Sequence, residues 1–164
     1  MPDILIRSAE LRDVPAMLGI YAPYVEETSV SFEYAVPSEE EFRSRLERVQ
    51  GFYPWLVAEQ QSRVLGYAYA SRFHPRAAYD WSVEVSIYLE RGERGRGIGR
   101  RVVRRLIERG RQLGYSTLYI GDIYSWNTAS RRCFESQGFR PYAKTENGDK
   151  YMLEFSTQNN SAAE

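Results

Sequence analysis

The 164-residue sequence predicts a single α/β domain with a mixed central sheet. Strand-like and helix-like patterns follow one another in the order β-α-α-β-β-β-α-β-α-β-β, which is about seven strands and about four helices. A glycine-rich turn, residues 94–99, connects one strand pattern to a long amphipathic helix pattern. Hydrophobic residues make up 43% of the chain, which suffices for a core. We expect the domain to cover residues 1–156, and the polar residues 157–164 to form a disordered tail.

Capping and turn residues divide the first half of the chain into elements. Ser38 is followed by three glutamates, which is typical of a helix N-cap and a first helical turn. Pro15 suits the first turn of an earlier helix. Gln60-Gln61-Ser62 separates two strand-like runs and predicts a hairpin. The predicted elements are a strand over Ile4–Arg7, a helix that begins at Asp13, a helix from Ser38 to near Gly51, and strands over Trp55–Glu59 and Val64–Ser71.

Periodic apolar residues define the second half of the chain. From Val83 to Leu89, apolar and more polar residues alternate, which predicts a strand with two different faces. An apolar stripe with helical spacing then predicts a helix from Ile98 to Leu113. Gly138 is placed to end a later helix at its C′ position. The remaining predicted elements are a strand over Thr117–Ile120, a helix over Thr128–Gln137, and strands over Phe139–Ala143 and Tyr151–Phe155 around a turn at Asn147-Gly148.

Charge is balanced over the whole chain but concentrated in one segment. The formal net charge is zero, so no overall field attracts nucleic acid or a membrane surface. Glu90 to Arg111 nevertheless contains nine arginines and three glutamates. A neutral protein with one basic element is more typical of a binder of a small polyanion than of a polymer.

Cysteine and histidine usage restricts the possible chemistry. Cys133 is the only cysteine, so no intrachain disulfide forms, which fits a reducing cytoplasm. The N-terminus lacks the pattern of a signal peptide, and no apolar run approaches membrane-spanning length. His74 is the only histidine, so a histidine-rich metal site is excluded and no metal is expected. These observations predict a cytoplasmic protein.

The glycine-rich turn Arg94-Gly95-Arg96-Gly97-Ile98-Gly99 is suited to binding phosphate. Glycine lets the backbone approach a ligand closely, and the first helical N–H groups have no partner within the helix. The helix N-terminus also carries partial positive charge. The turn lacks the Gly-Lys-Ser/Thr of a P-loop, and its Arg-x-x-Gly-x-Gly spacing differs from that of a Rossmann fold.

Three segments carry a resemblance to a known superfamily. They are Val85-Ser86-Ile87-Tyr88-Leu89, the turn Arg94–Gly99, and Asn127-Thr128-Ala129-Ser130 followed by Phe134 and Gly138-Phe139. Together they resemble the acetyl-CoA signature of the GNAT N-acetyltransferases, and the order of elements is similar over about Ile4 to Phe155. The resemblance implies a GNAT-like fold, acetyl-CoA as co-substrate, and transfer of an acetyl group to an amine in a ternary complex.

A narrower resemblance points to the phosphinothricin and methionine sulfoximine acetyltransferases. It implies a small-molecule acceptor, an amino acid or an analogue, and a homodimer. Those enzymes have a longer segment after Phe139, where this chain has only Pro141 to Asp149 between its last two strands. A polyamine, an aminoglycoside or a protein N-terminus therefore stays open as acceptor, and so does a non-catalytic acyl-CoA-binding module. The segments that carry this resemblance are Glu27–Phe32, Tyr53–Glu59, Gly66–Ala70 and Ala78–Glu84.

The resemblance also implies which residues bind acetyl-CoA. The main chain of the glycine-rich turn holds the diphosphate, with help from nearby guanidinium groups. The strand before it binds the pantetheine arm and the acetyl group, and one of its N–H groups polarises the thioester carbonyl. Asn127 binds the pantetheine arm, although it is also a plain helix N-cap. The expected cofactor-binding residues are Ile87, Tyr88, Leu89, Arg94, Gly95, Arg96, Gly97, Ile98, Gly99, Arg100, Asn127 and Ser130.

Glu84 is the expected general base. Attack on a thioester requires a neutral amine, and a carboxylate is suited to accept the proton. Alternation alone favours a polar residue on a half-exposed strand face, whereas the family motif favours the base. Trp81 and Trp126 are candidates for the apolar surroundings that would raise the pKa of Glu84.

The acceptor is expected to contact residues of two loops and of the strand that carries Glu84. Arg76 is a candidate for the carboxylate of an amino acid, with an exposed loop residue as the alternative. The position of a proton-donating tyrosine in relatives is Phe134 here, so solvent, Tyr124 or Tyr142 protonates the leaving thiolate. The expected substrate-binding residues are Thr28, Phe32, His74, Arg76, Glu84 and Ser86.

Overall fold

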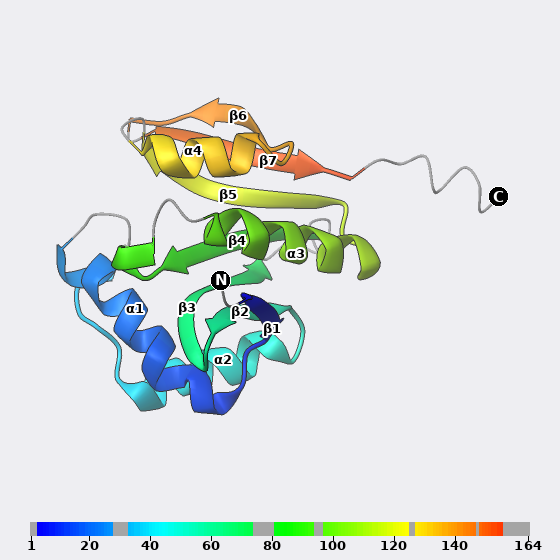
Figure 1. The fold of residues 1–164 in the computed structure, drawn as a ribbon. Coiled ribbons are helices and arrows are strands. Elements are labelled where there is room, and N and C mark those ends of the chain that lie inside the picture. Colours follow the sequence, from blue (N-terminus) through cyan, green and yellow to red (C-terminus); the bar gives the residue numbers. More distant parts are fainter. Residues whose placement is uncertain are drawn as a thin grey trace. The chain divides into compact units, whose positions relative to one another are not determined.

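The structure is a computed structural model of the chain. It describes residues 3–27, 33–73, 81–93, 97–124, 127–146 and 148–155. In this part of the chain, seven strands are hydrogen-bonded in the order β1-β2-β3-β4-β5-β7-β6, and the predicted mixed α/β fold is confirmed (Figure 1). The strands are β1 Leu5–Ser8, β2 Trp55–Gln60, β3 Arg63–Arg72, β4 Ser82–Leu89, β5 Thr117–Tyr124, β6 Arg140–Lys144 and β7 Gly148–Glu154. The helices are α1 Val14–Glu27, α2 Glu39–Gln50, α3 Ile98–Gln112 and α4 Thr128–Glu135.

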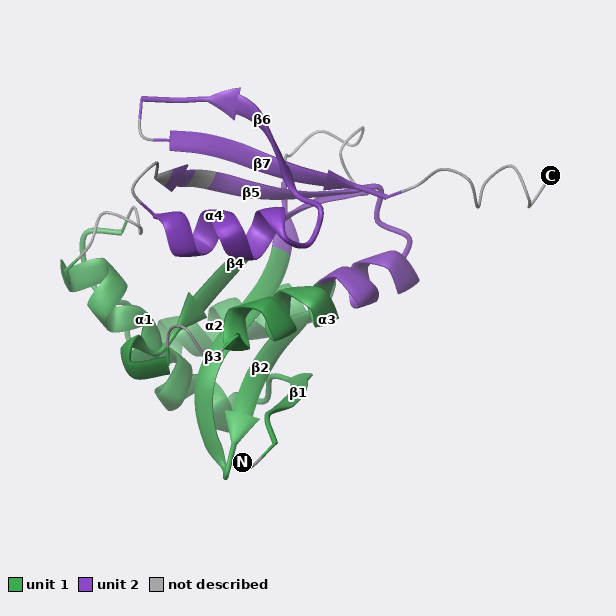
Figure 2. Ribbon diagram, turned by 45° about the horizontal axis from the view of Figure 1, so that its top comes forward, with its two compact units in different colours: residues 1–70, 86–106 green, residues 71–85, 107–164 purple. Residues whose placement is uncertain are grey.

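The chain divides into two compact units, which Figure 2 colours separately. Unit 1 contains residues 1–70 and 86–106, and unit 2 contains residues 71–85 and 107–164. Strand β4 and helix α3 each contribute residues to both units. Across the described residues, no helix combines the length and the apolar character that a membrane crossing requires.

Unit 1 is built on an aromatic core between two helices and three antiparallel strands. Strand β2 pairs with β1 on one side and with β3 on the other. Gln61 and Ser62 both have positive φ, as a tight two-residue hairpin turn requires, so the predicted hairpin is confirmed. Phe42 of α2 packs edge-on against Trp55 and Tyr67 of the sheet. The other buried members of this core are Ala9, Val14, Met17, Ile20, Tyr21, Leu46, Val57 and Val64.

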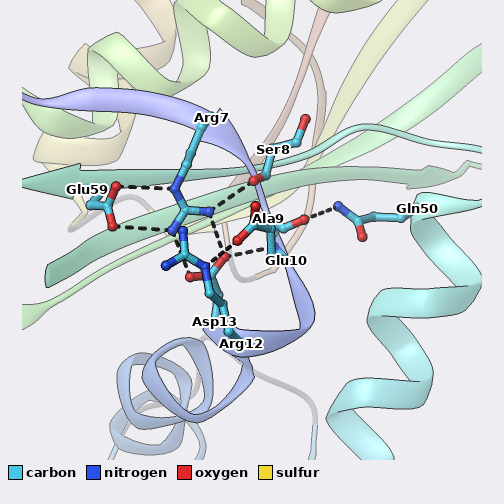
Figure 3. Close-up of polar contacts among 8 residues, drawn as sticks. All are labelled: Arg7, Ser8, Ala9, Glu10, Arg12, Asp13, Gln50 and Glu59. Atoms are coloured by element: carbon cyan, nitrogen blue, oxygen red, sulfur yellow. Dashed lines mark hydrogen bonds and ion pairs between the residues drawn. The ribbon is translucent and has the colours of Figure 1, made fainter. Parts of the chain in front are cut away.

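A charged network fastens β1 of unit 1 to the start of α1 and to β2 (Figure 3). The Arg7 guanidinium donates two hydrogen bonds of 2.8 Å to the Asp13 carboxylate and longer ones to Glu59. Asp13 also accepts a 2.7 Å hydrogen bond from the Glu10 backbone N–H. Burial alone would raise the pKa of Asp13, but the hydrogen bonds from Arg7 and Glu10 and the charge of Arg7 hold it below its usual range.

Unit 2 is a mixed sheet with helix α4 on one face. Strand β7 pairs with β5 and β6, and residues 82–84 of β4 pair with β5 in parallel. The Tyr151 hydroxyl of β7 donates a 2.6 Å hydrogen bond to Glu135 of α4, and the Arg131 Nε–H of α4 donates to the same hydroxyl at 3.3 Å. Helix α4 therefore covers the face of β7 on which Tyr151 lies.

Several predicted boundaries are wrong by one to four residues. Strand β5 continues past Ile120 to Tyr124, because a bulge between Ile120 and Ile123 accommodates Gly121. Strand β7 begins at Gly148 rather than Tyr151, and α4 ends at Glu135, before Gly138 with its left-handed φ of 99°. The predicted end of helix α3 at Leu113 is also wrong. The helix ends at Gln112, and Leu113, which was expected in its apolar stripe, is 42% exposed.

We predict that Arg7→Met lowers the free energy of unfolding by about 3 kcal/mol at pH 7, because it leaves a buried carboxylate without its cation. Urea denaturation measures this change. The contribution of Asp13 is present above the pKa of unfolded aspartate and is lost as pH falls through the lower folded pKa. The matched control is Arg12→Met, whose ion pair with Glu10 is more than half exposed and is worth less than about 1 kcal/mol. Equal losses in the two variants would contradict the prediction.

Candidate functional site

The first turn of α3, in unit 1, presents backbone N–H groups without helical partners. Gly97 has a φ of 77°, and the first helical hydrogen bond runs from the Arg101 N–H to the Gly97 carbonyl at 3.2 Å. The amides of Ile98, Gly99 and Arg100 precede this bond and have no partner within the helix. The Ile98 side chain is buried and the Arg100 side chain is exposed. This geometry suits an anion approached by the backbone, as the sequence predicts.

The end of β4, also in unit 1, has a partner that the sequence did not indicate. The Tyr24 hydroxyl of α1 donates a 2.8 Å hydrogen bond to the Leu89 carbonyl and accepts a 3.4 Å hydrogen bond from the Leu89 N–H. The next residue, Glu90, donates its N–H to the Leu65 carbonyl of the neighbouring strand β3 at 2.9 Å. Tyr24 was missed because only the fold brings α1 to this peptide group.

The side chain of Tyr88 belongs to the aromatic core of unit 1. Its ring lies edge-on to Tyr21 and Tyr24 at centroid distances of 5.0 and 5.2 Å. Burial and neighbouring tyrosines raise its pKa well above the usual value. Gly66 lets β3 approach this segment, since a Cβ there would lie 2.6 Å from Leu89 Cδ2 and 3.1 Å from the Tyr88 carbonyl oxygen. A ligand at this part of β4 would therefore meet the backbone of Tyr88 and not its hydroxyl.

Glu84 lies in unit 2 at the point where β4 pairs with β5. Its Cα is in register with that of Tyr119, and its side chain is half-buried. A Cβ on Gly121 would lie 3.2 Å from Glu84 Oε1, so the missing side chain at the bulge provides room for the carboxylate. Burial raises the pKa of Glu84, and the positive charge of Lys150 on β7 opposes that rise only in part.

The sequence predicts that Trp81 helps to form apolar surroundings for Glu84, but the structure places its ring elsewhere. Trp81 is 62% exposed and its ring lies 4.0 Å from the position of a Cβ on Gly114, at the other end of this segment of β4. Trp126 lies outside the described residues. The predicted strand ends at Ile120 and so leaves out Gly121, although a glycine within a strand also marks bulges and close approaches.

Asn127 caps α4, as one of its two interpretations predicts. Its Oδ1 accepts a 3.2 Å hydrogen bond from the Ser130 N–H. The side-chain NH₂ group keeps its capacity to donate to a ligand. Phe134, four residues past Ser130, is buried against Phe139 at a centroid distance of 5.4 Å and offers no proton.

Some predicted site residues have no described structure. Ser86 is described, and it lies half-buried on β4. In the described ranges, no three His, Cys, Asp or Glu side chains gather into a group that could hold a metal ion. The predicted site residues outside the described ranges are Thr28, Phe32, His74, Arg76, Arg94, Gly95 and Arg96.

Comparison with known proteins identifies the family to which the chain belongs. A model of the GNAT acetyltransferase domain matches residues 6–152. A phosphinothricin N-acetyltransferase of Alcaligenes faecalis is 38% identical over 77% of this chain, and the chain spans only 65% of that relative. An L-methionine sulfoximine/L-methionine sulfone acetyltransferase of Salmonella typhimurium is 32% identical to this chain. The similarity covers 82% of this chain and 78% of that relative.

A solved structure is similar over nearly the whole chain. It is a GNAT superfamily phosphinothricin acetyltransferase from Sinorhizobium meliloti in complex with acetyl-CoA. The TM-score is 0.85 and the identity 28%, and the similarity covers 93% of this chain and 89% of that one. The chain belongs to the GNAT family of acetyltransferases.

Proposed function

We propose that this protein transfers the acetyl group of acetyl-CoA to the amine of an amino acid or an amino acid analogue. The observation that carries the proposal is the half-buried Glu84 carboxylate on the same strand as Ile87 to Leu89. The names of two relatives support the acceptor class, since they act on phosphinothricin and on methionine sulfoximine or sulfone. A homodimer, a cytoplasmic location and a single domain over residues 1–156 stay predictions.

The chain's own groups divide the chemistry between them. Acetyl-CoA supplies a thioester, whose carbonyl carbon is attacked by the amine nitrogen while the thiol leaves. Glu84 takes the proton that the amine must lose, because a protonated amine has no lone pair for attack. A carboxylate with a raised pKa is a stronger base than an exposed one, so the burial of Glu84 serves this role. Since Phe134 has no proton to give, the thiolate takes its proton from water, Tyr124 or Tyr142.

Binding of the co-substrate is assigned to backbone groups. The amides of Ile98, Gly99 and Arg100 have the direction and the free donors that a diphosphate requires. A backbone N–H of Ile87 to Leu89 stabilises the charge that develops on the carbonyl oxygen. The Leu89 N–H contact with Tyr24 is long at 3.4 Å, so a better acceptor on the pantetheine arm competes with it. Both assignments rest on the family resemblance together with these geometries.

Release of thiol from acetyl-CoA tests the function and the role of Glu84. We predict turnover with L-methionine sulfone or phosphinothricin, and a decrease in kcat of about 100-fold or more for Glu84→Gln. Calorimetry should give an acetyl-CoA Kd within about twofold of wild type, because the carboxylate does not hold the co-substrate. The matched control is Glu154→Gln on β7, whose carboxylate is exposed and pairs with Arg140. Unchanged turnover in the Glu84 variant would remove it from the role.

We predict that kcat falls at low pH, and that the midpoint of this fall lies above the usual pKa of glutamate. Glu84 acts as a base only when ionised, and burial raises its pKa above the usual value for glutamate. Activity therefore falls as pH decreases through this higher value. Two acceptors with different amine pKa values should give the same midpoint. A midpoint that changes with the pKa of the amine, or that lies at the usual pKa of glutamate, would contradict the prediction.

Gly97→Ala should weaken acetyl-CoA binding about tenfold. A Cβ at a φ of 77° costs about 1 kcal/mol or more, and relief of that strain turns the amides of the first helical turn away from the ligand. Gly92→Ala is the control, because a Cβ there has no atom within 4 Å and the backbone φ is not in the left-handed region. Isothermal titration with acetyl-CoA measures both Kd values. Equal affinities in the two variants would argue against binding at this turn.

A further inference from the structure

One face of the unit 2 sheet carries both an acidic and a basic side chain. Aligned neighbours in a sheet point their side chains to the same face, and residues two apart on a strand do too. Glu84 is aligned with Tyr119, and Tyr119 with Met152. Lys150 lies two residues from Met152 on β7, so it shares the face of Glu84. Tyr151 points to the other face, toward α4.

The two charged side chains converge on the bulge of β5. Lys150 lies between Tyr151, aligned with Ile120, and Asp149, aligned with Ile123, so it is opposite the bulged residues. Glu84 reaches the same place from β4, where its Oε1 occupies the space beside Gly121. A glycine at this position leaves room beside the carboxylate that a side chain would fill.

Glu84 and Lys150 do not form an ion pair with each other. Among the described residues, the charged group of Lys150 acts on that of Glu84 only at a distance, by lowering the pKa that burial raises. Adjacent strands lie about 4.8 Å apart, so the backbones of β4 and β7 are about 10 Å apart across β5, and the two side chains extend toward the space between them. An α-amino acid carries its ammonium and its carboxylate on one carbon, so each group can contact one of these side chains.

Aromatic rings line the same part of the sheet. Tyr119 stacks on Phe73 at a centroid distance of 3.8 Å and meets Tyr142 edge-on at 5.5 Å. Tyr142 is 41% exposed, so this row reaches solvent. Such rings provide an apolar surface for the aliphatic part of a small acceptor.

We propose that Lys150 binds the α-carboxylate of the acceptor amino acid while Glu84 receives the proton of its α-amine. The assignment rests on the proposed acetyl transfer and names a specificity-determining residue that the sequence did not indicate. A zwitterion satisfies both charges at once. A polyamine would place a second positive charge beside Lys150, so the same pair selects against it.

The test compares two acceptors that differ only in the carboxylate. L-methionine sulfone has it, and 3-(methylsulfonyl)propan-1-amine lacks it. We expect Lys150→Gln to lower kcat/KM for the amino acid about 10- to 100-fold, mainly through KM, and to leave kcat/KM for the amine within about threefold. Lys150→Arg keeps the positive charge and should restore most of the preference for the amino acid, although kcat for both acceptors should fall because a guanidinium can also bind Glu84. The matched control is Lys144→Gln, because Lys144 is the only other lysine, is exposed, and is aligned with Asp149 on the opposite face.

The possible results distinguish a failure of the role proposed for Lys150 from a failure of the proposed acetyl transfer. Loss of activity toward both acceptors in equal proportion would mean that Lys150 acts only on Glu84, and it would overturn the proposal. An unchanged preference for the amino acid would do the same. If wild-type protein acetylates neither acceptor nor any other amine, the proposed function itself fails. Should Lys150→Gln not fold, Lys150→Met provides the same comparison of the two acceptors.

Discussion

The hydrogen bonding of strand β4 is the constraint on which the proposed chemistry depends, because buried peptide groups need partners. Ser82 to Glu84 pair with β5, and the Glu90 N–H pairs with Leu65. Successive residues of a strand direct their N–H groups to opposite edges, so Leu89 presents its peptide groups at the edge away from Leu65. There the Tyr24 hydroxyl is a partner, at 3.4 Å for the N–H. A strand held in this way keeps its shape and can exchange one weak contact for a ligand.

The placement of Glu84 balances two opposing demands. A base must lose solvation for its pKa to rise, yet a buried carboxylate without a charge partner destabilises the fold. The separation between the Glu84 carboxylate and the Lys150 ammonium meets both demands. Lys150 is near enough to reduce the cost of burial and too far to form an ion pair. A direct ion pair would lower the pKa of Glu84 and occupy the oxygen atoms that must receive the proton.

The parts of the fold that depend on local signals were predictable from the sequence. Ser38 accepts a hydrogen bond from the Glu41 N–H, as its position before three glutamates indicates. Errors occurred where tertiary contacts override local preference. The predicted strand ends at Ile120, but pairing with β7 continues β5 past Gly121 to Tyr124. The last predicted strand begins at Tyr151, although Asp149 and Lys150 already pair with β6.

The candidate site divides in the same way. Gly97 and Asn127 could be found because a helix start has a local sequence pattern. Glu84 needed the family resemblance, since alternation alone leaves it a polar residue on a strand. Tyr24 and Lys150 could not be found, because their contacts join elements that are distant in the chain. A single sequence has no signal for such contacts.

The choice of lysine at position 150 fits an acceptor that brings its own carboxylate. Of the 22 basic residues, only two are lysines. A guanidinium has a planar fork of donors that matches a carboxylate in two-point fashion, so an arginine here would be suited to bind Glu84 itself. An ammonium on a flexible stem makes single contacts in any direction and competes less for the base. In the proposed mechanism, the lysine therefore leaves Glu84 free to take a proton and keeps one positive charge for the carboxylate of the acceptor.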